Sequence, residues 1–95
     1  MSVRITGKVV GFTEQGDAIT DISVALLQDA PRSDKVRVWC DPHETFGLYD
    51  EVHQEPHATF LAVLAAGGYL QLRVVGMSAR ELLGIELGQP VVIEW

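Results

Sequence analysis

The chain has 95 residues, which suit one folded domain spanning residues 1–95. Its formal net charge is −6 and its seven basic residues are scattered; nucleic acids and anionic membranes need a clustered basic face, so the sequence predicts neither partner. No signal peptide and no apolar run of about 20 residues is evident, and the single cysteine cannot form an intrachain disulfide, which together favour a cytoplasmic protein.

Two strand-like runs occupy the first part of the chain. Residues 3–12 alternate apolar and polar side chains, which is typical of a half-buried strand. Gly16 and Asp17 then break the run with a turn signal. Residues 18–27 resume with β-branched side chains and predict a second strand, and residues 28–34 predict a polar loop around a proline.

The middle of the chain predicts two further strands. Residues 35–41 alternate again and predict a third strand. Residues 43–50 predict a weaker strand with a bulge or bend at Gly47, because a glycine inside a strand often marks one. Residues 51–57 predict an acidic loop.

The strongest strand signal follows this loop. Residues 58–75 consist of two apolar runs joined by Gly67 and Gly68, which is typical of a tight hairpin.

A short helix is predicted between the last two strands. Ser78 and Glu81 have the spacing of a capping box, and Gly84 suits a left-handed C-cap. Leu82 and Leu83 are expected to cover an open end of the core. Pro90 then begins the last strand, where a missing N–H matters least.

These elements predict an all-β fold of about seven short strands with one short helix before the last strand. Regular short strands separated by turns favour an antiparallel barrel or sandwich. We favour the barrel, because closure removes exposed strand edges in a chain rich in Val, Ile and Leu.

The last third of the chain resembles a known family. Segments 68–72 (Gly-Tyr-Leu-Gln-Leu), 75–79, 82–84 (Leu-Leu-Gly) and 88–91 look like the end of the C-terminal domain of the SAM hydroxide adenosyltransferases, which are relatives of the SAM-dependent chlorinases and fluorinases. Upstream, residues 16–22 and 43–50 resemble further segments of that domain, in the same order.

The resemblance implies a Greek-key antiparallel β-barrel that helps to hold an adenosyl group, with ligand sites between the subunits of a homotrimer. In the family a separate N-terminal α/β domain handles the nucleophile, and these 95 residues hold no counterpart of it. We therefore expect a stand-alone binding or assembly module that does not catalyse adenosyl transfer by itself. A protein of this kind has no catalytic residue and no cofactor of its own, and SAM or adenosine is the ligand that the resemblance suggests.

The resemblance also marks candidate ligand-binding residues, which are Gly16, Asp17, Tyr69, Val75 and Gly76. Asp17 and Val75 stand where the family pattern has Asn. An ionised Asp can only accept hydrogen bonds and Val has no polar side-chain atom, so we expect at most a residual nucleoside pocket.

Two alternatives remain open. The chain could be one subunit of a split SAM-hydrolysing enzyme, completed by a separate catalytic domain. It could also bind a metal ion through residues drawn from Cys40, His43, Glu44, His53, Glu55 and His57.

We favour the simpler interpretation of those side chains. Pro56 separates His53 from His57, so these two are not expected to share a helical face, and solvated loop histidines are the default. Cys40 has no basic neighbour that would lower its pKa and is predicted to be a buried core residue. Trp95 is expected to mark a surface for self-association.

Overall fold

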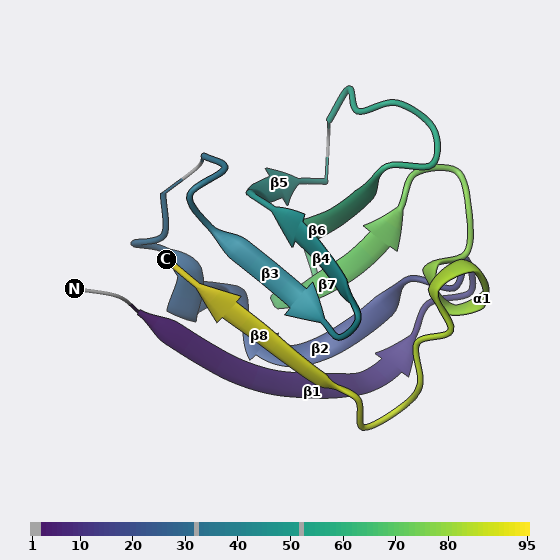
Figure 1. Cartoon of the computed structure of the whole chain (residues 1–95), viewed down its shortest axis with the longest axis horizontal. Helices are drawn as coiled ribbons and strands as arrows, with labels where there is room; N and C mark the ends of the chain where they lie inside the picture. Colours follow the sequence, from purple (N-terminus) through teal and green to yellow (C-terminus); the bar gives the residue numbers. More distant parts are fainter. Residues whose placement is uncertain (1–2, 32, 52) are drawn as a thin grey trace.

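A computed structural model of the chain describes residues 3–31, 33–51 and 53–95. Arg32 and Val52, which fall in the two predicted loops, lie outside the described residues, as do residues 1–2. The described chain forms eight strands, a 3-10 helix η1 (Val24–Leu27) and a helix α1 (Ala79–Leu83) (Figure 1). The strands are β1 (Arg4–Phe12), β2 (Ala18–Ser23), β3 (Arg37–Cys40), β4 (His43–Phe46), β5 (Leu48–Asp50), β6 (Phe60–Leu64), β7 (Tyr69–Val74) and β8 (Pro90–Glu94).

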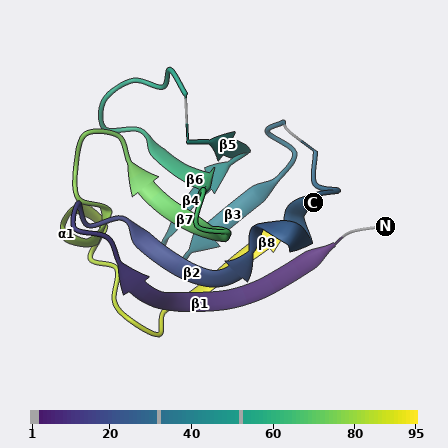
Figure 2. The ribbon, with the colours of Figure 1, turned by 180° about the vertical axis from the view of Figure 1, so that it is seen from behind.

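The strands form a single sheet that curls into a nearly closed barrel. Their order is β4-β3-β8-β1-β2-β7-β6-β5, so β8 returns to lie between β1 and β3 (Figures 1 and 2). Across the remaining seam, the Thr45 hydroxyl of β4 donates to the Phe60 carbonyl of β6 at 2.8 Å. The prediction of an all-β barrel with a short helix before the last strand is confirmed.

One strand pair differs from the predicted antiparallel pattern. β5 pairs with β6 in parallel, with Leu48 opposite Ala62, whereas the other pairs are antiparallel. Gly47 divides the predicted strand 43–50 into β4 and β5, which accounts for eight strands where about seven were predicted. Its φ of 92° suits glycine, and this bend sends β4 to β3 and β5 to β6.

The predicted second strand ends earlier than its composition suggests. β2 stops at Ser23, and the next four residues form η1 rather than continuing the strand. The Ser23 hydroxyl accepts a hydrogen bond from the Ala25 amide at 3.2 Å. This bond replaces the inter-strand hydrogen bond that the Ala25 amide would make if the strand continued. This turn places Leu27 in the core.

Alternating side chains of the strands build the core inside the barrel. Leu70 and Leu72 of β7 and Val91 and Ile93 of β8 are fully buried, as the strand period of two requires. Cys40 is also fully buried, as predicted.

The helix α1 closes one end of the barrel, and the start of β1 and the end of β8 lie at the other end (Figure 1). The Ser78 hydroxyl accepts from the Glu81 amide at 3.2 Å, and Gly84 ends the helix with a φ of 67°, which confirms both predicted caps. Ala79 and Leu83, four residues apart, face the core, whereas Leu82 is 51% exposed. The expectation that Leu82 covers the core is wrong: of the two leucines, only Leu83 packs against the core.

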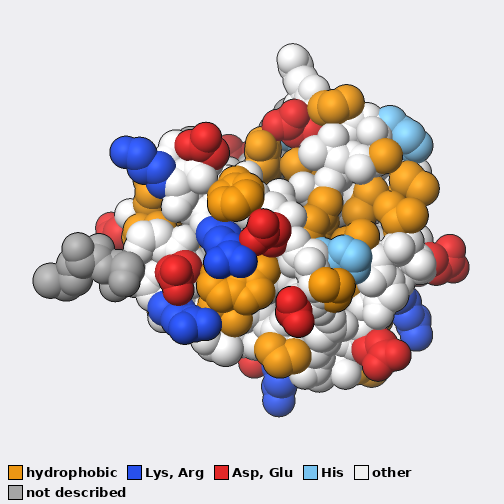
Figure 3. All heavy atoms as spheres, in the orientation of Figure 1, with side chains coloured by type: hydrophobic (Ala, Val, Ile, Leu, Met, Phe, Trp, Pro, Cys, Tyr) orange, Lys and Arg blue, Asp and Glu red, His pale blue; other side chains and the backbone are white. Residues whose placement is uncertain are grey.

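Charged side chains are interspersed over the visible surface (Figure 3). Acidic and basic groups lie next to one another there. One exposed ion pair joins Arg37 Nε to Glu44 Oε2 at 2.7 Å. Neither helix in the described part of the chain has the length and apolar character needed to cross a bilayer.

Candidate functional site

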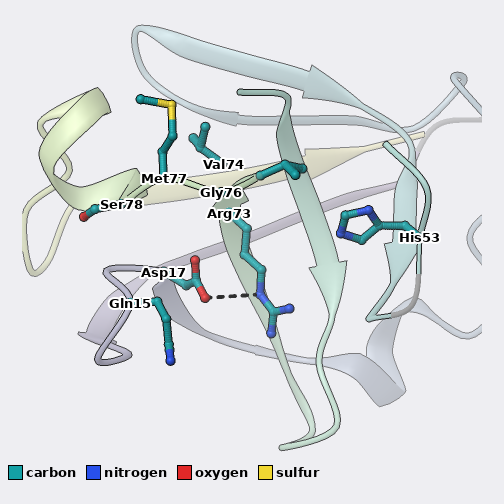
Figure 4. A pocket seen from close by; sticks show the side chains of 9 residues that line it. Gln15, Asp17, His53, Arg73, Val74, Gly76, Met77 and Ser78 are labelled. Atoms are coloured by element: carbon teal, nitrogen blue, oxygen red, sulfur yellow. Dashed lines mark ion pairs between the residues drawn. The ribbon is translucent and has the colours of Figure 1, made fainter. Parts of the chain in front are cut away.

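A pocket of about 540 Å³ lies beside the start of α1 (Figure 4). This volume falls within the range of about 300–1,000 Å³ that small-molecule sites occupy. Three stretches far apart in the sequence meet there: the turn after β1, the loop after β5, and the end of β7 with the turn that follows it. The lining residues are Gln15, Asp17, His53, Arg73, Val74, Val75, Gly76, Met77 and Ser78.

Most of the predicted ligand-binding residues come together at this pocket. Asp17, Val75 and Gly76 line it directly. Gly16 lines an adjoining hollow of about 240 Å³ that shares Gln15 with the pocket.

Tyr69 does not reach the pocket. It is the first residue of β7, pairs with Ser23 of β2 and is 49% exposed. The pocket takes its β7 residues from the opposite end of that strand, beginning at Arg73. A strand of this length separates its ends by more than about 15 Å, so Tyr69 belongs to the far side of the barrel.

Gly16 is required at the pocket for its backbone and its lack of a side chain. Its φ is 89°, and a Cβ at this position would lie 2.0 Å from the Ser78 hydroxyl oxygen. Its carbonyl accepts from the Arg80 amide at 2.9 Å. The turn after β1 is thereby fastened to the first turn of α1, next to Ser78, which lines the pocket.

Gly76, which lines the pocket, also needs both a positive φ and the absence of a side chain. Its φ is 74°, and a Cβ there would meet the His57 ring nitrogen Nδ1 at 2.4 Å. Val75 next to it exchanges backbone hydrogen bonds with the loop after β5, accepting from Ala58 at 2.8 Å and donating to Thr59 at 2.9 Å. These contacts bring the loop that carries His53 against the end of β7.

Arg73 is the principal charged group of the pocket, and sequence reasoning did not single it out. Its Nε lies 3.5 Å from Asp17 Oδ2. A dashed line in Figure 4 marks this ion pair. The Nη2 atom donates to Glu51 Oε1. Nε and Nη2 also both donate to Gln71 Oε1, at 3.0 and 2.7 Å. In the sequence, the only signal for Arg73 is that it is a polar residue within an apolar strand. Its acidic partners lie in two separate loops, so the sequence gives no sign of the ion pairs.

The contacts of Arg73 also affect Glu51, an exposed residue that does not itself line the pocket. The hydrogen bond from Arg73, assisted by a backbone hydrogen bond at Ala66 and by the positive charge, lowers the pKa of the Glu51 carboxyl. Glu51 is therefore held as a carboxylate over a wider pH range than an isolated glutamate.

The residues named for a metal site do not assemble into one. No group of three His, Cys, Asp or Glu side chains in the described ranges could hold a metal ion. Burial, and then the neighbouring Asp41 charge, raise the pKa of the Cys40 thiol, which disfavours the thiolate form that binds metals.

Two of the three histidines are not freely solvated loop residues. The His43 ring contacts the Leu83 carbonyl at 3.0 Å and meets the Phe60 ring edge-on at 6.5 Å between centroids, so it fastens β4 to the end of α1. His53 is half-buried in the pocket wall, and His57 is exposed beside Gly76.

No protein-family model and no curated protein matches the sequence. Solved structures share the fold. An uncharacterized conserved protein from Thermotoga maritima matches with a TM-score of 0.73 and 22% identity over 95% of this chain. A conserved hypothetical protein from Thermus thermophilus matches with a TM-score of 0.70 and 28% identity over 93% of it. This chain spans about a third of both, 35% of the first and 34% of the second, and corresponds to one barrel-shaped part of longer proteins.

Proposed function

We propose that the protein is a non-catalytic binding module that takes an adenosyl compound, adenosine or SAM, in the pocket beside α1. One observation carries the proposal. Asp17, Val75 and Gly76, which the family resemblance marks for adenosyl contact, come from two distant segments and line one pocket of suitable size.

The chemistry of the lining supports a nucleoside. The Asp17 carboxylate can accept hydrogen bonds from ribose hydroxyls, as acidic residues do in dinucleotide-binding folds. Val75 and Met77 offer apolar contact to a purine. The Val75 backbone groups are already bonded to the neighbouring loop, so polar contacts to the base fall to Gln15 and His53.

A titration followed by amide chemical shifts tests this function. Adenosine and SAM are expected to perturb the amides of residues 15–17 and 73–78 in the millimolar range or below. Asp17→Ala should weaken both ligands, while Asp21→Ala serves as a matched control. Asp21 accepts from the Lys8 amide on the neighbouring strand and does not line the pocket. Absence of perturbation at millimolar ligand removes the proposal.

We also propose that the module works as a homo-oligomer, a trimer in the family pattern, in the cytoplasm. Several apolar side chains left in solvent by the single chain support association, among them Leu82 and Leu87 at 51% and 65% exposure. Sedimentation equilibrium decides the assembly, and a monomer at high concentration would contradict it.

A second candidate is a split SAM-hydrolysing enzyme completed by a separate catalytic domain. It is favoured by two solved structures that share this barrel, both of which are about three times as long as this chain. Mixing the chain with a separately encoded N-terminal-type domain should then release adenosine from SAM faster than either component alone, and Asp17→Ala should reduce the gain. A mixture no faster than its parts excludes this candidate.

A further inference from the structure

The guanidinium of Arg73 looks at first like an anion-binding group, because it lines a ligand-sized pocket and is only 22% exposed. Arginine recognises phosphate through two parallel N–H donors, using either the Nε–Nη2 edge or the Nη1–Nη2 edge. Both arrangements need a hydrogen of Nη2.

In this chain both Nη2 hydrogens are engaged. One is directed to Gln71 Oε1, which also takes the Nε hydrogen, and the other to Glu51 Oε1. Neither two-donor edge is therefore free for a phosphate.

The charges around Arg73 also disfavour phosphate binding. Two carboxylates, Asp17 and Glu51, lie against the single guanidinium, so the group carries a net negative charge at neutral pH. Asp17 and Arg73 are largely shielded from solvent, with 15% and 22% of their side chains exposed, and shielded charges are screened by salt less than exposed ones. A phosphate entering the pocket would meet the Asp17 carboxylate, while the Glu51 carboxylate, whose side chain is 41% exposed, also pairs with Arg73.

We infer that Glu51 determines whether the ligand can carry a phosphate: by occupying Arg73 it makes the pocket accept nucleosides without a phosphate group and exclude phosphorylated ones. The nucleoside part of this inference rests on the proposed function; the exclusion of phosphate rests on the Arg73 contacts alone.

The test compares three probes, adenosine, AMP and inorganic phosphate, by amide shifts of residues 15–17 and 73–78 at low salt. Wild-type protein is expected to bind adenosine at least about tenfold more tightly than AMP and to show no response to phosphate at these amides. Glu51→Gln removes the charge and Glu51→Ala also frees the Nη1–Nη2 edge. Glu51→Ala is expected to raise AMP affinity by about tenfold and to create a phosphate response. Glu51→Gln, whose amide oxygen can still accept from Nη2, is expected to raise AMP affinity less, and in both variants adenosine affinity should change by less than about twofold.

Glu44→Gln is the matched control. Glu44 pairs with Arg37 through Nε at 2.7 Å on the outer face of the sheet, and neither residue lines the pocket. This variant should change no ligand's affinity.

The two failures are distinguishable. If wild-type protein binds AMP as tightly as adenosine, or if phosphate shifts the pocket amides in wild type as in the Glu51 variants, the inference is wrong while the nucleoside site stands. If adenosine does not bind, the proposed function fails, and the phosphate series still decides the role of Glu51: a response confined to the variants supports it, and no response in the variants overturns it.

Discussion

At the scale of single residues, the pocket depends on a close contact between a glycine and a serine. Gly16 has a φ of 89°, which glycine adopts without strain, and it packs so closely against the Ser78 hydroxyl that a side chain would not fit. This contact joins the turn after β1 to α1. A substitution at Gly16 is therefore expected to displace both the pocket residues nearby and the helix at the end of the barrel.

Replacing Gly16 by alanine is expected to destabilise the protein more than the same change at Gly68. The two glycines have nearly the same φ, 89° and 93°, but an added Cβ at Gly68 meets nothing within 4 Å. Gly68→Ala therefore measures the backbone strain alone, about 1 kcal/mol, and Gly16→Ala should add about 1–3 kcal/mol for the clash with Ser78. Urea unfolding of the two variants gives the comparison, and equal losses would contradict the packing argument.

Cys40 is expected to be unreactive in the folded protein. It is fully buried, and burial together with Asp41 raises its pKa, so the thiolate fraction at pH 8 is smaller than that of a free cysteine. A thiol-reactive disulfide reagent should modify it only in denaturant, and raising the pH to 9 should accelerate the native reaction little, because access rather than ionisation limits it. Rapid stoichiometric modification of the native chain at pH 8 would show that the thiol is accessible.

At the scale of elements, α1 is held by its caps and by one side of a single turn. Five residues are too few for a helix to be stable by its own propensity, so its stability comes from the Ser78 and Gly84 caps and from Ala79 and Leu83 against the core. The Gly16 carbonyl adds an external acceptor for the Arg80 amide.

Removing the N-cap hydroxyl with Ser78→Ala should lower the free energy of unfolding by about 1 kcal/mol. The Ser33→Ala variant is the control, because the Ser33 hydroxyl accepts from the Lys35 amide at 3.3 Å in a loop and caps no helix. Urea unfolding and amide exchange of residues 79–83 measure the effect. If exchange in this segment is unchanged, the hydroxyl does not hold the helix.

At the scale of the whole molecule, exposed apolar side chains lie at both ends of the barrel. Leu87 lies after α1 at the edge of a shallow hollow of about 600 Å³, and Leu26 of η1 lies at the end where β1 starts and β8 ends (Figures 1 and 2). Phe12 and Ile85 also line this hollow, together with the charged side chains of Arg80, Glu81 and Glu86.

If the chain associates as proposed, Leu87→Asp should dissociate it, because a carboxylate in an apolar contact loses its hydration without a partner. Leu26→Asp is the matched control, since Leu26 is 59% exposed and Leu87 is 65% exposed. Sedimentation velocity distinguishes the two variants, and dissociation by Leu26→Asp alone would place the contact at the opposite end.

The amino-acid sequence alone was sufficient for local structure. Alternation identified β1 and β3, and two apolar runs joined by Gly67 and Gly68 identified β6 and β7. The spacing of Ser78, Glu81 and Gly84 identified both ends of α1. These signals act between residues a few positions apart. The sequence also marked Gly16 as a turn residue. It could not show that this turn lies against Ser78, since that depends on how the barrel closes.

The tertiary structure alone decided the rest. The bend at Gly47 pairs β4 with β3 and β5 with β6. Tyr69 lies on the far side of the barrel from the pocket, and Arg73 forms ion pairs with Asp17 and Glu51. Each of these features depends either on contacts between residues more than about 12 positions apart or on the direction in which two strands pair. Periodicity and capping report only on neighbours along the chain, so contacts created by closing the sheet leave no local signal.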